Sequence, residues 1–176
     1  MKNLFVLVGV PGTGKSTFIQ KHLLPQLNLS TKVISRDEIR FSIVGINEEY
    51  FSHEKEVFEE FIKQIKYSLN ENTNTIVDAT HINCGSRTKL LRAIGEDLKD
   101  VSVYAIVILN DLDTILAQNE NRTGRAYVPE SAIRRMYASF SQPTLDEGFT
   151  EIMFYKNGEL IYSIVSCGGW HPQEGE

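Results

Sequence analysis

The stretch from Gly9 to Ser16 reads Gly-Val-Pro-Gly-Thr-Gly-Lys-Ser and fits the pattern G-x-x-x-x-G-K-[ST]. Its glycines let the backbone fold around a phosphate group, where a Cβ atom would obstruct it. The amide hydrogens of such a loop converge on the phosphate oxygens, and the following helix presents the positive end of its dipole. The stretch therefore predicts a phosphate-binding loop between a strand and a helix.

The end of this loop has the chemistry that a nucleoside triphosphate and its metal ion require. Lys15 is expected to reach the β- and γ-phosphates, and the hydroxyl of Ser16 is expected to bind Mg²⁺. A glycine-rich turn with a chance lysine is the alternative, but the strand–loop–helix context argues against it. We expect ATP to be the donor, and the residues expected to contact it are Gly9, Pro11, Gly12, Thr13, Gly14, Lys15, Ser16 and Thr17.

The bulk composition is typical of one soluble domain. Of the 176 residues, 41% are hydrophobic and 23% are charged, so we expect a packed core. The net charge of -5 argues against a general nucleic-acid coat, yet it permits a local basic groove. No apolar run approaches the ~20 residues that span a bilayer, and the two cysteines, Cys84 and Cys167, have neither metal nor disulfide spacing. A cytoplasmic protein without a membrane partner is expected.

Strands and helices are expected to alternate along the chain. Short apolar runs predict strands at 4–8, 31–35, 75–77, 101–109, 152–155 and 160–165, the last two joined by a turn at 156–159. Helical spacing and proline position predict helices at 16–27, 48–69, 86–98, 113–119 and 129–140. This order predicts an α/β fold of the P-loop NTPase type, with a mainly parallel sheet flanked by helices. One domain is expected over 1–167, followed by a flexible tail over 168–176.

The segment Ser35-Arg-Asp37-Glu-Ile-Arg40 follows the second predicted strand. Ligands collect at the carboxyl ends of the strands in such sheets, so Asp37 is expected on the rim that faces the phosphates. A carboxylate there can accept the proton of an acceptor hydroxyl as the γ-phosphoryl group leaves. Arg40 would share a helical face with Asp37 and could grip an anionic part of the acceptor. The alternative is that Asp37 caps a helix and Arg40 is a solvated ion-pair partner, and the sequence does not decide between the two.

Polar residues also follow the third predicted strand, in Thr75-Ile-Val-Asp78-Ala-Thr-His81-Ile-Asn83. Asp78 is placed to hold Mg²⁺ through water or to organise the acceptor site, and a cap or turn residue is its alternative. Asn83 is a further candidate for contact with the acceptor. It ranks below Asp78, because residues like Asn83 and His81 more often satisfy the backbone of their own loop.

A basic loop spans residues 119–129, between two predicted helices. Loops of this type close over a triphosphate, and their arginines neutralise charge that develops on the transferred group. Arg122 and Arg125 are the candidates, and Gly124 favours mobility. The alternative is a solvated surface loop. The sequence therefore predicts a helical lid that carries a catalytic arginine, without deciding which of the two it is.

Taken in this order, the segments resemble the 5′-kinase domain of phage-type polynucleotide kinases and the wider group of small ATP-dependent P-loop kinases. The likeness covers roughly residues 2–145. Its most discriminating parts are the segment 36–40 and the segment Tyr127-Val-Pro129, which Met136 and Tyr137 follow. The resemblance implies an arginine-bearing helical lid over a kinase site.

The resemblance also implies roles for the residues at matching positions. Lys15 and Ser16 would handle phosphate and Mg²⁺. Asp37 would act as general base for a 5′-hydroxyl, and Asp78 would support the acceptor site. Arg40 would hold the phosphate on the 3′ side of the terminal nucleotide. A lid arginine would contact the transferred phosphate.

The implied protein is an ATP-dependent phosphotransferase that acts on the 5′-hydroxyl end of RNA or DNA. The 3′-phosphatase half of the bifunctional phage enzymes is missing, so end repair would need a separate phosphatase or ligase partner. A P-loop kinase for a nucleoside, sugar or antibiotic is the alternative, because the acidic net charge leaves room for an acceptor that is not a nucleic acid.

Overall fold

A six-stranded sheet forms the centre of the computed structural model, which describes residues 2–27 and 30–165. Its strand order is β2-β3-β1-β4-β5-β6, and every neighbouring pair is parallel except β5 and β6. The strands are β1 (Lys2–Val8), β2 (Thr31–Ser35), β3 (Asn74–Asp78), β4 (Val101–Leu109), β5 (Glu151–Lys156) and β6 (Glu159–Val165). The predicted α/β fold with a mainly parallel sheet is confirmed.

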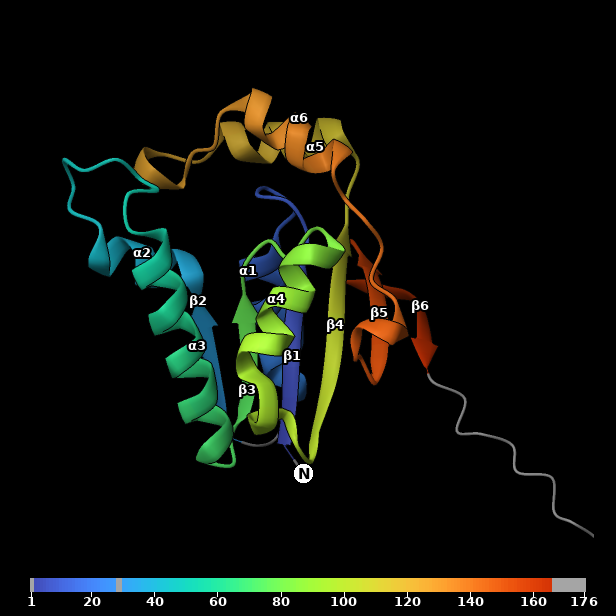
Figure 1. Ribbon diagram of the computed structural model, residues 1–176. Coiled ribbons are helices and arrows are strands. Elements are labelled where there is room, and N and C mark those ends of the chain that lie inside the picture. The colour runs from blue at the N-terminus through green and yellow to red at the C-terminus, as the bar shows by residue number, and fades with distance from the viewer. Residues whose placement is uncertain (1, 28–29, 166–176) are drawn as a thin grey trace, which may run out of the picture.

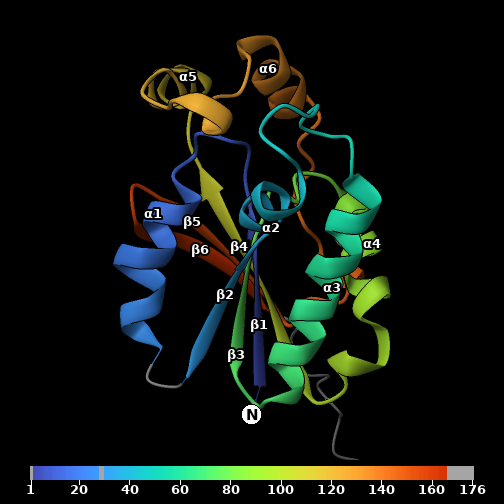
Figure 2. The same cartoon turned by 90° about the vertical axis from the view of Figure 1, so that its left-hand side faces the viewer.

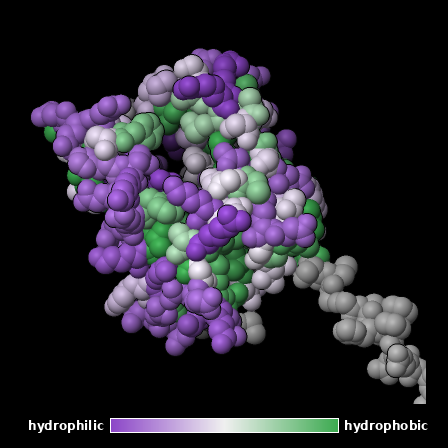
Figure 3. Space-filling model, in the orientation of Figure 1, coloured by the Kyte–Doolittle hydropathy of each residue, from purple (hydrophilic) through white to green (hydrophobic). Residues whose placement is uncertain are grey.

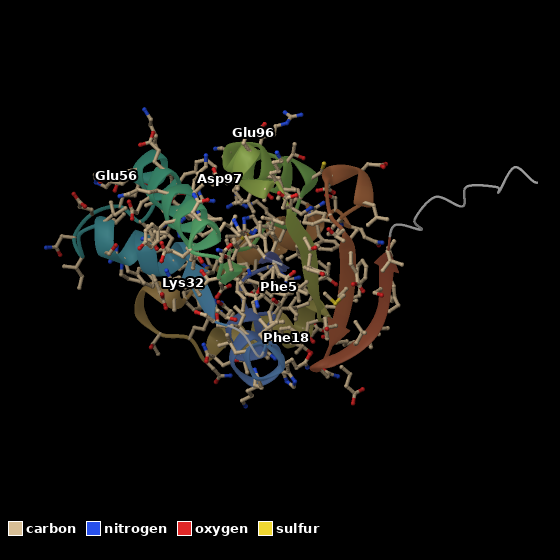
Figure 4. All side chains as sticks on the ribbon, turned by 90° about the horizontal axis from the view of Figure 1, so that it is seen from below. Phe5, Phe18, Lys32, Glu56, Glu96 and Asp97 are labelled. Carbon is tan, nitrogen blue, oxygen red and sulfur yellow. The ribbon has the colours of Figure 1, made fainter. Side chains whose placement is uncertain are left out.

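Helices cover both faces of this sheet (Figure 2). One face carries α1 (Lys15–Phe18), which continues as the π-helix η1 (Ile19–Leu23) and the 3₁₀ turn η2 (Leu24–Gln26). The other face carries α3 (Glu54–Asn70) and α4 (Cys84–Ile94), which the 3₁₀ turn η3 (Gly95–Leu98) follows. Seen from below, Phe5 and Phe18 lie on the α1 side, whereas Glu96 and Asp97 lie on the opposite side (Figure 4).

The first strand supplies both hydrophobic cores. Leu4, Val6 and Val8 pack into the core beneath α3 and α4, while Phe5 and Leu7 pack into the core beneath α1. All five side chains are buried. A central parallel strand is covered on both faces, which is why its sequence is a continuous apolar run rather than an alternating one. This fixed strand places the phosphate-loop sequence at the carboxyl edge of the sheet.

Two helices stand over that edge (Figure 1). They are α5 (Leu112–Glu120) and α6 (Glu130–Ala138), joined through the 3₁₀ turn η4 (Gly124–Ala126), and we call residues 112–138 the lid. A small apolar cluster seats the lid on the molecule, and it consists of Val10, Ile82, Ile115 and Ile133. Figure 3 shows a hollow below the lid. Because Val10 belongs to the phosphate loop, this cluster packs the lid directly against that loop.

Several predicted elements agree with the structure. The bounds of β2 and β4 are those predicted, and the turn at 156–159 joins an antiparallel hairpin at the sheet edge. Within the described residues, no helix is long and apolar enough to cross a membrane. Cys84 is an exposed free thiol. Cys167 and the tail predicted for 168–176 lie outside the described residues, so the domain division stays a prediction.

The helix predicted for 48–69 is wrong at its start, because α3 begins at Glu54. The residues before it form turns, in which the Glu48 carboxylate accepts from the Gly45 amide at 2.7 Å. The aromatic residues Tyr50 and Phe51 fitted the helical spacing, but their rings lie beside the guanidinium of Arg40 instead. Their contacts with this cation, rather than core packing, therefore explain the apolar pattern there.

Two other predicted helices are less regular than expected. The segment predicted for 16–27 is α-helical only to Phe18, and Pro25 lies in its final 3₁₀ turn. Proline lacks an N–H and clashes with the carbonyl four residues earlier, so a regular helix cannot pass through it. The helix predicted for 86–98 begins at Cys84 and changes to 3₁₀ geometry at Gly95, whose φ is 62°.

Candidate active site

The phosphate loop depends on glycine geometry at Gly12 and Gly14. Their φ angles are 91° and 88°, in the left-handed region that favours glycine. A Cβ atom on Gly12 would also lie 2.7 Å from the Ile115 carbonyl oxygen, so the close approach of α5 requires a glycine there. Gly14 precedes the first turn of α1 and has no side chain to accept from the amides of that turn. This geometry fits the phosphate group that the sequence predicts.

Lys15 is buried inside the loop. Its Nζ donates to the carbonyl oxygens of Gly9 at 2.8 Å and Val10 at 3.0 Å. Burial lowers the pKa of Lys15 to about 8, and the nearby Asp78 carboxylate opposes this shift. The loop therefore holds a desolvated ammonium, which gains more from a phosphate partner than an exposed lysine would.

Ser16 and Asp78 meet at the same edge. Ser16 Oγ donates to Asp78 Oδ2 at 3.0 Å, which links the start of α1 to the end of β3. Burial raises the pKa of Asp78, while Lys15 opposes the rise. Hydroxyl and carboxylate oxygens are ligands that Mg²⁺ prefers. The described residues hold no group of three or more His, Cys, Asp and Glu side chains suited to a metal, so Mg²⁺ here would need phosphate and water oxygens as well.

A pocket of about 450 Å³ extends from the phosphate loop toward β6. This volume suits a small-molecule ligand. Phe18 and His22 stack at 5.4 Å, and Gly158 leaves room for the imidazole, since a Cβ atom there would lie 2.5 Å from His22 Cε1. Among the remaining lining residues are Asn110, Gln118, Asn121, Arg122 and Asn157.

Sequence reasoning missed this part of the pocket. The sequence gives His22 no supporting spacing, and it predicts only a turn between two strands at 156–159. No sequence motif identifies His22 or the β5–β6 turn, because they meet only when the β5–β6 hairpin packs against the helical segment that follows the phosphate loop. Asn110 is the exception, since it directly follows β4 at the carboxyl edge.

Asp37 lies in the first turn of α2 (Arg36–Ile43), after β2. In the sheet, β2 and the strands β4 to β6 beside the pocket lie on opposite sides of β1. Its side chain is 67% exposed, and Oδ1 accepts from Tyr50 Oη at 3.0 Å and from Arg40 Nη1. The helix cap is Ser35, whose Oγ accepts from the Glu38 amide at 3.4 Å. The cap interpretation of Asp37 is therefore wrong, and its carboxylate is held by Tyr50 and Arg40 while it remains largely exposed.

Arg40 shares a helical face with Asp37, as predicted, but it is not a solvated ion-pair partner. The residue is 5% exposed, and Nε donates to Glu54 Oε1 at 2.7 Å while Nη1 donates to Tyr50 Oη at 3.2 Å. Glu54 also accepts from Arg36 at 2.9 Å. Binding of an acceptor phosphate by Arg40 stays a prediction. Such a phosphate would compete with Glu54 and Tyr50 for the guanidinium group.

The two lid arginines lie on different sides of the site. Arg122 lines the pocket. Its positive charge is close enough to act on Lys15 and Asp78, although burial has the larger effect on the pKa of each. Arg125 Nη2 donates to the Val44 carbonyl at 3.0 Å, in the loop after α2. Arg122 thus lies at the pocket beside the phosphate loop, whereas Arg125 lies at the loop after α2, a division that the sequence left open.

The residues after β3 have structural partners. Asn83 Oδ1 accepts from the Ser86 amide at 2.9 Å and caps α4, so its contact with an acceptor stays a prediction. His81 is buried with Nδ1 3.3 Å from the Leu7 carbonyl oxygen, and burial lowers its pKa to about 3. A neutral His81 therefore connects the loop that follows Asp78 to β1.

Comparison with known proteins places this site in a family context. Residues 4–143 match the family model described as AAA domain. An L-seryl-tRNA(Sec) kinase from Methanococcus maripaludis is 30% identical over 148 residues, which cover 80% of this chain and 53% of that protein. The chain thus spans about half the length of the curated relative it matches.

Solved structures share the fold. Kti12 from Chaetomium thermophilum, in complex with ADP-AlF3, has a TM-score of 0.67 at 15% identity over 87% of this chain and 88% of that one. A chain of the Pnkp1/Rnl/Hen1 RNA repair complex has a TM-score of 0.60 at 22% identity, covering 78% of this chain and 43% of that one. At these identities the likeness shows that the fold is shared, and no more.

Proposed function

The chain belongs to the AAA domain family, and from that membership we propose that it is an ATP-dependent kinase that phosphorylates a hydroxyl group of a nucleic acid. One observation carries the proposal. The exposed carboxylate of Asp37 follows β2 at the carboxyl edge of the parallel sheet, which is the same edge at which the phosphate loop follows β1. A base on one side of a phosphate loop is the arrangement that phosphoryl transfer to a hydroxyl requires.

The donor side of the site is assigned to the phosphate loop and its pocket. When bound, ATP would supply the γ-phosphoryl group, and Mg²⁺ would offset charge on the phosphates. Lys15 would exchange its two carbonyl partners for phosphate oxygens, and Ser16 with Asp78 would hold the metal ion. Arg122 would stabilise charge on the transferred group, because it already lines the pocket beside the loop.

The acceptor side is assigned to Asp37 and the residues that hold it. Asp37 would accept the proton of the acceptor hydroxyl, and its contacts with Arg40 and Tyr50 orient the carboxylate. Arg40 is buried against Glu54, so we assign it first to positioning Asp37. Contact between Arg40 and an acceptor phosphate remains a second role to be tested.

The acceptor that we propose is the 5′-hydroxyl end of RNA or DNA. The resemblance of the phosphate-loop, Asp37 and lid segments to polynucleotide 5′-kinases supports it. The matched fold in an RNA repair complex is compatible with it. Repair by this chain would then involve a separate phosphatase or ligase partner.

A second acceptor is favoured by one specific observation. The curated relative at 30% identity is named L-seryl-tRNA(Sec) kinase, so a hydroxyl on an aminoacylated RNA is a candidate. Both acceptors would present the end of a nucleic acid to Asp37. They differ in whether the phosphorylated oxygen belongs to a ribose or to an amino acid.

A transfer assay with labelled γ-phosphate separates these acceptors. It would compare RNA and DNA oligonucleotides with 5′-hydroxyl ends, a 3′-phosphorylated nucleoside, free nucleosides and seryl-tRNA(Sec). We expect transfer to the 5′-hydroxyl oligonucleotides. Transfer to seryl-tRNA(Sec) alone would select the second acceptor, and transfer to free nucleosides alone would contradict a nucleic-acid acceptor.

The matched variant for this assay is Asp37→Asn. It should lower transfer by about a hundredfold or more, because general-base catalysis contributes on that order. Its affinity for ATP should remain close to that of the unmodified chain, since Asp37 does not line the donor pocket. Near-normal turnover by Asp37→Asn would overturn the general-base assignment.

A further inference from the structure

Three aromatic rings form a continuous cluster beside Asp37. The centroid of Phe41 lies 6.1 Å from that of Tyr50, and the centroid of Tyr50 lies 4.8 Å from that of Phe51, both edge-on. Phe41 comes from α2, whereas the other two come from the loop before α3. We call Phe41, Tyr50 and Phe51 the aromatic platform.

The platform is exposed although its residues are suited to a core. Phe41 is 37% and Phe51 is 63% exposed. Full burial of a phenylalanine side chain is worth roughly 1.5–3 kcal/mol, so leaving two of them accessible forgoes stability. The contacts of the rings with arginine side chains position them, but they leave Phe41 and Phe51 accessible to solvent. Exposed aromatic residues grouped at a site are typical of a binding surface.

Two guanidinium groups lie against these rings. Arg40 is centred 4.8 Å from the Tyr50 ring and 5.4 Å from the Phe51 ring, and Arg125 is centred 5.1 Å from the Phe41 ring. Arg125 belongs to the lid, and its bond to the Val44 carbonyl joins the lid to the loop that carries the platform. The rings therefore expose apolar surface next to positive charge, and Tyr50 connects them to Asp37.

We propose that the aromatic platform stacks the nucleobase of the nucleotide that presents the acceptor hydroxyl, in a single-stranded end; this inference rests on the proposed function. Single-stranded nucleic acids are held by stacking of bases on aromatic side chains, together with positive charge along the backbone. Every nucleobase has a π-face, so the platform accepts bases without strong sequence preference. A neutral sugar has neither a π-face for the rings nor a phosphate for Arg125.

The test is a binding measurement with a fluorescent base. An oligonucleotide with 2-aminopurine at its 5′-hydroxyl terminus is titrated with the protein, and the quenching of the base by stacking is followed. The variant is Phe51→Leu, which keeps an apolar side chain but removes the ring. We expect quenching with the unmodified chain and a dissociation constant at least about fivefold higher for Phe51→Leu.

The matched control variant is Tyr67→Leu. Tyr67 is 61% exposed and also has a cation over its ring, Lys32 at 4.7 Å. It lies near the end of α3 that is remote from Asp37. Quenching and affinity should therefore be unchanged in Tyr67→Leu. An equal loss in both variants would mean that exposed rings bind the probe without specificity, and the proposal would fail.

An abasic acceptor separates this proposal from the proposed function. In the transfer assay, a 5′-terminal abasic nucleotide should raise the KM of the oligonucleotide for the unmodified chain and have little further effect on Phe51→Leu. Transfer that is indifferent to the terminal base would overturn the platform while leaving the kinase assignment standing. Base-dependent quenching without any transfer would retain the platform and overturn the kinase assignment.

Discussion

At the scale of single residues, two opposite charges of the site occupy different surroundings. Lys15 is buried and satisfied by carbonyl oxygens of its own loop. Asp37 is largely exposed and held by a phenol and a guanidinium. Removing an ammonium from water weakens its charged form, whereas donors around a carboxylate fix its direction. Each of these two environments leads to a testable prediction for the residue it surrounds.

Binding of ATP should weaken as the pH rises through about 8. Burial lowers the pKa of Lys15 to about 8, so the nucleotide-free protein loses this charge above that pH. Because phosphate favours the charged ammonium, binding above that pH must take up a proton, and binding below it need not. Calorimetry at about pH 9 in two buffers of different ionisation enthalpy should show this uptake.

The variant Lys15→Met provides the control for this measurement. It should bind ATP weakly at every pH, and the proton uptake should disappear with the ammonium. An unmodified chain whose affinity stays flat from about pH 7 to pH 9.5 would contradict the assignment to Lys15.

Tyr50→Phe should lower kcat for phosphoryl transfer by about three- to tenfold. The change keeps the ring but removes the hydroxyl that donates to Asp37 and accepts from Arg40. Burial and the Asp37 charge raise the pKa of Tyr50, so the phenol stays a donor at neutral pH. Hydrogen bonds to charged groups contribute about 1.5–3 kcal/mol, and only part of this acts on the orientation of the base.

Steady-state kinetics distinguish positioning from general damage to the fold. The KM for ATP should be unchanged in Tyr50→Phe, since Tyr50 does not line the donor pocket. A parallel rise in the KM for ATP, or an unaltered kcat, would exclude Tyr50 as a positioning residue for Asp37.

At the scale of elements, one buried ion pair fixes the loops behind the site. Arg87 of α4 is fully buried and pairs with Glu147 of η5 (Leu145–Glu147), with bonds of 2.7 and 2.8 Å. Its Nη1 also donates to the carbonyl oxygens of His81 and Ser141, both at 3.0 Å. The pair therefore joins α4, the loop that follows Asp78 and the segment that follows the lid.

Arg87→Met should lower the free energy of unfolding by about 3–5 kcal/mol, because it leaves the Glu147 carboxylate buried without its partner. The double variant Arg87→Met/Glu147→Leu should recover part of this loss, since both charges are then removed. Denaturant unfolding of the three proteins measures both effects. A single variant as stable as the unmodified chain would show that the pair contributes nothing to stability.

At the scale of the whole molecule, the net charge repels a polyanion, whereas the local charge at the site attracts one. The chain carries -5 at neutral pH, yet Arg40, Arg122 and Arg125 lie around one site. An overall negative protein repels a polyanion at long range, and salt screens that repulsion. On the proposed nucleic-acid acceptor, only the few phosphates near the reacting end would therefore meet positive charge.

Transfer to a single-stranded oligonucleotide should depend only weakly on salt. Each phosphate neutralised on a single strand contributes about -0.7 to the slope of log affinity against log salt. One to three contacts thus predict a slope between about -0.7 and -2. The KM of the oligonucleotide, measured over a range of potassium chloride concentrations, gives this slope.

Arg125→Ala should make the slope shallower by about 0.7 if this residue meets an acceptor phosphate. The exposed helix arginine Arg134 is the control, since it pairs with Glu130 at 2.7 Å on the outside of α6. A steep slope with many phosphate contacts would indicate a nucleic-acid surface much larger than the site described here.

Much of the fold follows from local pattern. The apolar run of β1, the glycines of the phosphate loop and the Val/Ile content of β4 depend on neighbours along the chain, so the sequence is sufficient to predict them. The start of α3 could not be predicted in this way. The rings of Tyr50 and Phe51 fit a helical stripe, and only their contacts with Arg40, ten residues or more earlier, show that they belong to a loop.

The residues of the site likewise fall into those that local sequence predicts and those whose positions depend on packing. The phosphate loop can be predicted without a structure, because the strand, the glycines, Lys15 and Ser16 are contiguous and their chemistry follows from their spacing. Packing in three dimensions buries Arg40 against Glu54, sets Arg122 at the pocket beside the phosphate loop, and sets Arg125 against the aromatic platform. These relations join segments far apart in the chain, and only the packing of the lid and loops against the sheet sets the distances between them.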